Sequence, residues 1–179
     1  MVRGVALLLI LSPAVALCQT PDFSGTWRLD EERSNVNMEA TLTGLIGGGA
    51  PPTLHITQPA NGTLVVESQI NESHARLYVP DGRTTTPVFL GPAGTITMTT
   101  RWEGQALVSE GTRDSSSGPS TKVKEAFALS ADGQTLEVAI SNSTADGTSS
   151  SSLRYSRIQD VGSCKSWPSP CKDFSRLGR

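Results

Sequence analysis

Few residues in this chain have the types and spacing of a catalytic or metal site. The only two histidines are His55 and His74, and neither has the His-x-His or Glu-x-x-His spacing that brings two ligands to one metal ion. Asp30, Glu31 and Glu32 form an acidic run that could be one wall of an acid/base site. Adjacent carboxylates at an exposed strand end usually stay hydrated, however. The sequence therefore predicts no metal, no cofactor and no catalytic residue.

Nucleophilic chemistry has no clear signature either. The chain is rich in serine but lacks a Gly-x-Ser-x-Gly elbow. A Ser-His-Asp site is made by geometry rather than by spacing, so the sequence leaves that possibility open.

Among the carboxylates, Glu125 is the one whose predicted position most suggests a chemical role. In TKVKEAFAL (121–129) it alternates in step with Val123, Phe127 and Leu129, which places it on an apolar face. A carboxylate buried there needs a partner or a raised pKa. The alternative is that Glu125 lies at a strand bulge and points to solvent.

The elements that would position these residues are strands. Apolar and polar residues alternate in nine runs, a pattern typical of half-buried antiparallel strands. The runs are 25–29, 53–57, 63–70, 73–79, 95–102, 105–113, 121–129, 134–140 and 151–158. In 73–79 the alternation puts Leu77 and Val79 on the dry face, with Arg76 and Tyr78 on the wet face. Both histidines are likewise predicted to face solvent.

Turn residues separate these runs. Examples are Asp81-Gly82, Glu103-Gly104, Asp132-Gly133 and Asp146-Gly147, which suit turns that need a positive φ. Short hairpins between sequential strands make an up-and-down meander. Closure removes exposed edges, so the sequence predicts an all-β barrel of about eight antiparallel strands.

One segment after the first strand does not alternate. Residues 34–52 could hold a short helix over Met38 to Ile46, followed by a Gly/Pro break. Val36 or Met38, Leu42 and Leu45 or Ile46 would form its apolar stripe. Such a helix would be a lid or plug over one end of the barrel. The alternative is a mobile surface loop.

A closed barrel of this size leaves an interior that is filled by side chains or holds one small ligand. We expect the ligand contacts to come from inward-facing positions on several strands. The candidates are Trp102, Met98, Phe127, Glu125, Tyr155, Val66 and Leu77.

The N-terminus indicates export. Arg3 precedes an apolar run, and small residues follow near Ala16, as in a secretory signal peptide, while the run is too short to span a membrane. We expect a signal peptide over 1–18, a barrel domain over 19–158 and a tail over 159–179. The compartment would be secreted or periplasmic. Cleavage after Ala16 is an alternative, and lipid attachment at Cys18 is less favoured because the bulky Leu17 precedes it.

The two remaining cysteines agree with an oxidising compartment. Cys164 and Cys171 lie close together in the tail, where a disulfide is the favoured interpretation over a two-thiol metal site. The charges nearly balance, with 15 Lys+Arg against 17 Asp+Glu. That balance lacks the basic footprint of a nucleic-acid or anionic-membrane binder.

Two motifs carry a family resemblance. Gly25-Thr26-Trp27, within DFSGTWRLDEERS, resembles the first strand of the lipocalins and the wider calycin group. Together with TRWEGQALVSEG (100–111) it looks like small secreted bacterial lipocalin-like proteins, mostly uncharacterised, over about residues 22–158. The resemblance implies that Trp27 closes one end of the barrel beneath an arginine from near the last strand. Arg154 and Arg157 are the candidates; they project to opposite faces, so only one can do this.

Two functions fit these expectations. The first is an exported, non-enzymatic protein that holds a small apolar ligand inside the barrel. The second is a structural or interaction module of the cell envelope whose barrel is filled by its own side chains. A third and weaker hypothesis is an enzyme that uses Glu125, His55 or the acidic run. The sequence does not indicate an oligomeric state.

Overall fold

The computed structural model describes residues 20–41, 49–59, 62–68, 75–89, 95–113 and 120–158. Within these ranges the chain forms ten strands and one short helix. In chain order they are β1 (Gly25–Leu29), α1 (Met38–Thr41), β2 (Thr53–Thr57), β3 (Leu64–Ser68), β4 (Arg76–Tyr78), β5 (Asp81–Phe89), β6 (Thr95–Glu103), β7 (Ala106–Arg113), β8 (Thr121–Leu129), β9 (Thr135–Thr144) and β10 (Gly147–Ile158).

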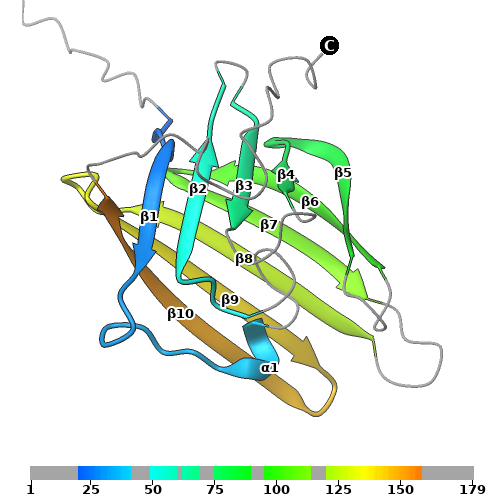
Figure 1. Cartoon of the computed structure of the whole chain (residues 1–179). Coiled ribbons are helices and arrows are strands. Elements are labelled where there is room, and N and C mark those ends of the chain that lie inside the picture. The colour runs from blue at the N-terminus through cyan, green and yellow to red at the C-terminus, as the bar shows by residue number, and fades with distance from the viewer. Residues whose placement is uncertain are drawn as a thin grey trace, which may run out of the picture.

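The strands form one antiparallel sheet that curls into a nearly closed barrel (Figure 1). Its order is β4-β3-β2-β1-β10-β9-β8-β7-β6-β5. The first strand pairs with the last, as the meander predicts, with Trp27 opposite both Leu54 and Arg157. The two ends of the sheet are β4 and β5, so the seam of the barrel lies between two strands that follow each other in the chain.

The expectation of about eight strands missed β5. Gly82 has the positive φ (69°) predicted for the Asp81-Gly82 turn, but a strand begins at this turn, and its pairing with β6 shifts register between Asp81 and Thr85. The sequence DGRTTTPVF has no clean alternation, and it contains Pro87, which lacks an N–H. An edge strand at the seam tolerates this proline because one of its sides has no partner strand to hydrogen-bond.

The core divides into two apolar clusters. The larger one fills the barrel beside β1, β2 and β10 and includes Trp27, Leu54, Phe127 and Leu153. The smaller one, Val88, Ile96, Met98 and Val123, lies on the inner faces of β5, β6 and β8. The alternation predicted for 95–102, 121–129 and 134–140 is confirmed by these buried positions.

The predicted helix is present but short, and its buried face differs from the expected one. Asn37 caps α1 by accepting hydrogen bonds from the backbone N–H groups of Glu39 (3.0 Å) and Ala40 (3.3 Å). Ala40 and Thr41 are buried, whereas Val36 and Met38 are 41% and 67% exposed. Asn37 fixes where the helix starts, and that start turns Met38 to solvent. The remaining stripe residues lie outside the described ranges.

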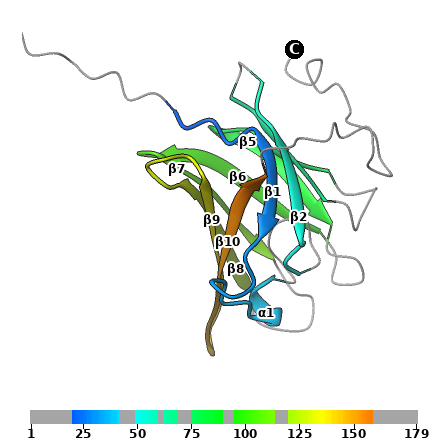
Figure 2. The same ribbon diagram turned by 60° about the vertical axis from the view of Figure 1, so that its left-hand side comes forward.

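The helix sits at one end of the barrel, beside β9 and β10 (Figure 2). We call this the helix end and the opposite end the tryptophan end. In the part of the chain that the structure describes, no helix is long and apolar enough to cross a membrane.

Several predictions fall outside the described residues. They are the signal peptide over 1–18 with Cys18, the tail over 159–179 with the Cys164–Cys171 disulfide, and the orientation of His74. These stay predictions.

Candidate functional site

The tryptophan end is sealed by side chains. Trp27 is fully buried and its indole Nε1 donates a hydrogen bond to the carbonyl of Phe23 at 3.0 Å. The guanidinium of Arg157 lies 4.3 Å from the centre of the Trp27 ring and donates to the carbonyls of Ser24 (2.6 Å) and Gly133 (3.0 Å). Of the two arginine candidates, Arg157 therefore covers the ring. Arg154 projects from the other face and pairs with Glu137 at 2.9 Å.

Aromatic rings pack beneath this seal. Phe23 stacks on Trp102 with 5.8 Å between ring centres and meets Phe127 edge-on at 6.5 Å. Phe127 in turn meets Tyr78 edge-on at 5.1 Å. Such contacts add to the area that each ring buries, so this end of the interior is filled by the protein's own side chains.

A charged pair lies inside the barrel. Glu125 on β8 is fully buried and its two carboxylate oxygens lie 2.9 Å and 2.6 Å from Nη1 and Nη2 of Arg76 on β4. The Tyr78 hydroxyl donates to the same carboxylate at 3.2 Å, and the Arg76 guanidinium lies 4.6 Å from the Tyr78 ring. Because β4 and β8 are not neighbours in the sheet, these contacts reach across the interior.

Burial shapes the electrostatics of this cluster. Desolvation raises the pKa of Tyr78 well above its usual value, the Arg76 charge opposes that rise, and Glu125 adds to it. Tyr78 therefore stays protonated and acts as a hydrogen-bond donor. Glu125 has the partner that a buried carboxylate needs, and the outward-pointing alternative is excluded.

The prediction of which face of strand 73–79 points into the barrel is wrong. Arg76 and Tyr78 point into the barrel, whereas Leu77 and Val79 are only half-buried, and Leu77 lies opposite Val65 on the other side of the sheet. Alternation fixes which residues share a face but not which face is inside. Glu125 decides it here, because the carboxylate compensates a buried guanidinium.

Three more polar side chains are buried on the inner face of the barrel, those of Thr100, Ser109 and Tyr155. Thr100 donates to Ser109 at 3.0 Å, and Ser109 lies directly opposite Glu125 on the neighbouring strand. Tyr155 on β10 is fully buried, and its hydroxyl has no hydrogen-bond partner among the residues that the structure describes. Desolvation raises the pKa of Tyr155, so the hydroxyl keeps its proton. A buried hydroxyl without a partner is uncommon, and a bound molecule would satisfy it.

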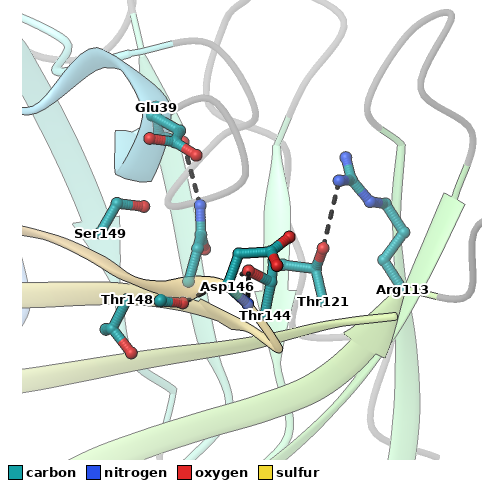
Figure 3. Close-up of a pocket in the computed structure, with 9 residues that line it drawn as sticks. Glu39, Arg113, Thr121, Thr144, Asp146, Thr148 and Ser149 are labelled. Atoms are coloured by element: carbon teal, nitrogen blue, oxygen red, sulfur yellow. Dashed lines mark hydrogen bonds between the residues drawn. The ribbon is translucent and has the colours of Figure 1, made fainter. Parts of the chain in front are cut away.

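A polar pocket of about 430 Å³ opens at the helix end (Figure 3). Asn142 donates from its side chain to the backbone carbonyls of Glu39 (2.9 Å) and Ala40 (3.3 Å), and Arg113 donates to Thr121 at 3.3 Å. Its lining residues are Glu39, Arg113, Thr121, Asn142, Thr144, Asp146, Gly147, Thr148 and Ser149. Asn142 pairs with Val123 of the smaller apolar cluster, so the pocket lies at the mouth of the barrel.

Sequence reasoning missed this pocket. The signal was present: Thr121 and Asn142 occupy inward positions in step with apolar residues, but only where β8 begins and β9 ends. Polar residues confined to one end of inward-facing stretches indicate a wet mouth.

Most of the predicted ligand contacts share the interior. Phe127, Tyr155 and Val66 belong to the larger cluster, and the partly buried Trp102 packs against it. Met98 belongs to the smaller cluster, and Glu125 is the acidic member of the charged pair. Leu77 does not join them. Their role in binding a ligand stays a prediction.

The other chemical candidates are not brought together. His55 hydrogen-bonds Thr26 at 3.0 Å between Nδ1 and Oγ1, and the expectation that it faces water is wrong because it is only 9% exposed. Desolvation lowers its pKa. Glu31 and Glu32 are exposed, as a hydrated strand end requires. No cluster of three or more metal-ligating side chains occurs among the residues that the structure describes.

No protein-family model and no curated protein sequence matches the chain. Solved structures do. The protein described as "REP1-NXSQ fatty acid transporter" is 13% identical, with a TM-score of 0.52, and the match covers 76% of this chain and 96% of that one. Lipid binding protein 8 of Caenorhabditis elegans, in its apo form, is 17% identical with a TM-score of 0.50, covering 76% and 95%. At such identities the likeness shows a shared fold alone, an antiparallel β-barrel.

Proposed function

We propose that this protein is an exported, non-enzymatic carrier that holds a small, mainly apolar ligand inside its barrel. The observation that carries the proposal is the Tyr155 hydroxyl, which is buried among apolar side chains and has no partner within the described part of the chain. A buried hydroxyl left unsatisfied costs about 1–3 kcal/mol. A ligand with one polar atom would remove that cost, while its apolar part would meet the surrounding core.

Two further facts support the proposal. The pocket at the helix end has a size typical for small-molecule sites and borders the inward positions of Thr121 and Asn142. The two structurally similar barrels are described as a fatty acid transporter and a lipid binding protein. Export rests on the N-terminal sequence, where a cation, an apolar run and small residues follow one another.

A dye titration of two variants tests the proposal. Nile red, an uncharged apolar dye, is expected to fluoresce when bound by the wild type. Tyr155→Phe should weaken the binding of ligands with a hydrogen-bonding atom several-fold. It should leave the free energy of unfolding unchanged or higher, since it deletes an unsatisfied hydroxyl.

Trp102→Ala is the companion variant. It should weaken dye binding if Trp102 lines the ligand site, because the ring offers a large apolar surface there. Failure of the wild type to take up Nile red would count against the carrier.

The aromatic packing of Phe23, Trp102 and Phe127 favours one second candidate. It is an interaction module of the cell envelope with a self-filled barrel. Under this alternative the wild type binds no apolar dye, and Tyr155→Phe changes stability alone.

A further inference from the structure

We infer that the ligand of this barrel is uncharged, and that Glu125 sets this preference by neutralising Arg76. The inference rests on the proposed carrier function and adds the chemical class of the ligand. In particular, we infer that the barrel does not bind an apolar chain that ends in an ionised carboxylate.

Arg76 and Glu125, buried inside the barrel, pair their charges with each other. Both terminal nitrogens of Arg76 contact the two carboxylate oxygens of Glu125. The Tyr78 hydroxyl donates a hydrogen bond to the same carboxylate. Arg76 is 5% exposed and Glu125 is fully buried. A planar guanidinium held in this paired geometry has its fork directed at the protein's own carboxylate. The pair contributes no net charge to the interior.

Glu125 lies on the path that the apolar chain of a ligand would follow from the helix end into the barrel. It lies on β8 between Val123 of the smaller cluster and Phe127 of the larger one. The pocket at the helix end lies on the Val123 side, and the aromatic packing lies on the Phe127 side. An anionic headgroup carried inwards would therefore meet Glu125, a like charge whose countercharge is already engaged.

The pocket at the helix end has no excess positive charge that would attract an anionic headgroup. Among the described residues, the pocket at the helix end is lined by one cation, Arg113, and by two carboxylates, those of Glu39 and Asp146. Its formal charge is thus negative by one. An ionised headgroup that stayed at the mouth would gain no net attraction there.

An uncharged ligand meets no such obstacle. Moving an ion into a poorly hydrated interior costs several kcal/mol unless a countercharge receives it, whereas a single hydroxyl or carbonyl needs only one hydrogen bond. The Tyr155 hydroxyl provides that hydrogen bond. Alcohols, esters, ketones and unsubstituted apolar molecules fit this description, and ionised fatty acids do not.

Matched probes test the inference directly. Decanol and decanoate have equal chain lengths and differ in charge at about pH 8, where a carboxyl group is ionised. Each would be titrated against Nile red bound to the purified protein. We expect decanol to displace the dye at a concentration at least about tenfold lower than decanoate does.

Glu125→Gln should reverse the preference, because it removes the carboxylate that neutralises the Arg76 guanidinium. Decanoate should then bind at least about tenfold more tightly than it binds the wild type. Glu110→Gln is the matched control, since Glu110 pairs with Arg101 and Lys124 on the outer face of the barrel. Arg76→Gln combined with Glu125→Gln removes both charges, and it should bind decanol while gaining nothing for decanoate.

The outcomes separate this inference from the function on which it rests. If the wild type binds decanoate as tightly as decanol, the inference is overturned and the carrier function stands. If it binds neither probe nor Nile red, both fail. A folded Glu125→Gln protein, verified by circular dichroism, that gains no affinity for decanoate would remove the role of Glu125. If that variant does not fold, the wild-type comparison of the two probes still decides the preference.

Discussion

At the scale of single residues, long-range partners decide which side chains matter. Arg157 and Arg154 are three positions apart on β10, yet one covers Trp27 while the other pairs with Glu137 on the outer face. The sequence narrows the choice to these two, because they project to opposite sides of one strand. It cannot choose between them without knowing which side is inside.

We predict that Arg157→Gln lowers the free energy of unfolding by about 2 kcal/mol, through loss of the cation–π contact and of charged hydrogen bonds to two carbonyls. Arg154→Gln should lower it by about 0.5 kcal/mol, as for other exposed ion pairs. Urea unfolding of both variants measures the difference. Equal losses would mean that Arg157 does not secure the Trp27 ring.

The buried Arg76–Glu125 pair is a second case in which the sequence alone does not show which side of a strand faces the interior. Alternation groups Arg76 with Tyr78, but placing charged residues outside is the natural prediction for a short strand. The deciding partner, Glu125, lies 49 positions away in the sequence. The inward-facing residues of the candidate site could therefore be predicted for 95–102, 121–129 and 134–140. They could not be predicted for 73–79, where a polar contact with a distant strand determines which face points inwards.

At the scale of elements, alternation of apolar and polar residues predicts a strand only where the buried positions are apolar, and in β5 one of the buried positions is the polar Thr86. It located nine of the ten described strands, and it missed β5, which is an edge strand rich in threonine. The barrel walls also depend on close approaches between strands that composition does not reveal. One of these is at Gly111, where β7 passes β6.

Gly111→Ala should disrupt that approach. An added Cβ would meet the carbonyl oxygen of Thr97 and the sulfur of Met98, so we expect a loss of about 3 kcal/mol in the free energy of unfolding. Gly104→Ala is the control, because its Cβ would enter open space at a φ of +62°. It should lose about 1 kcal/mol through backbone strain alone. A smaller loss for Gly111→Ala than for the control would contradict the observed pairing of β6 and β7.

The start of β5 gives a pH-dependent prediction. Asp81 accepts hydrogen bonds from the Thr84 hydroxyl and from the backbone N–H groups of Thr84 and Arg83, and these bonds lower the pKa of Asp81 from 3.8 to about 2. A lowered carboxyl pKa stabilises the fold above the unfolded-state value, and that contribution is lost as the pH falls through the folded-state value.

Asp81→Asn should therefore be less stable than the wild type at neutral pH, and the deficit should shrink as the pH falls from about 4 towards 2. Urea unfolding at several pH values measures it. A deficit of constant size down to the lowest pH would show that ionisation of Asp81 does not stabilise this turn.

At the scale of the whole molecule, the barrel has two unlike ends. Aromatic side chains and Arg157 seal the tryptophan end, and a polar pocket opens beside α1 at the helix end. Between them lie the neutralised Arg76–Glu125 pair and the Tyr155 hydroxyl. This arrangement suits a ligand that enters beside the helix and stops below the aromatic packing.

Solvent extraction of the purified protein, followed by mass spectrometry, tests this account most directly. Protein isolated under native conditions from its natural host should release a small, mainly apolar and uncharged molecule, about one per chain. Extraction should leave protein that takes up Nile red more readily than before. An extract without any such molecule, together with a barrel that takes up no dye before or after extraction, would contradict the carrier.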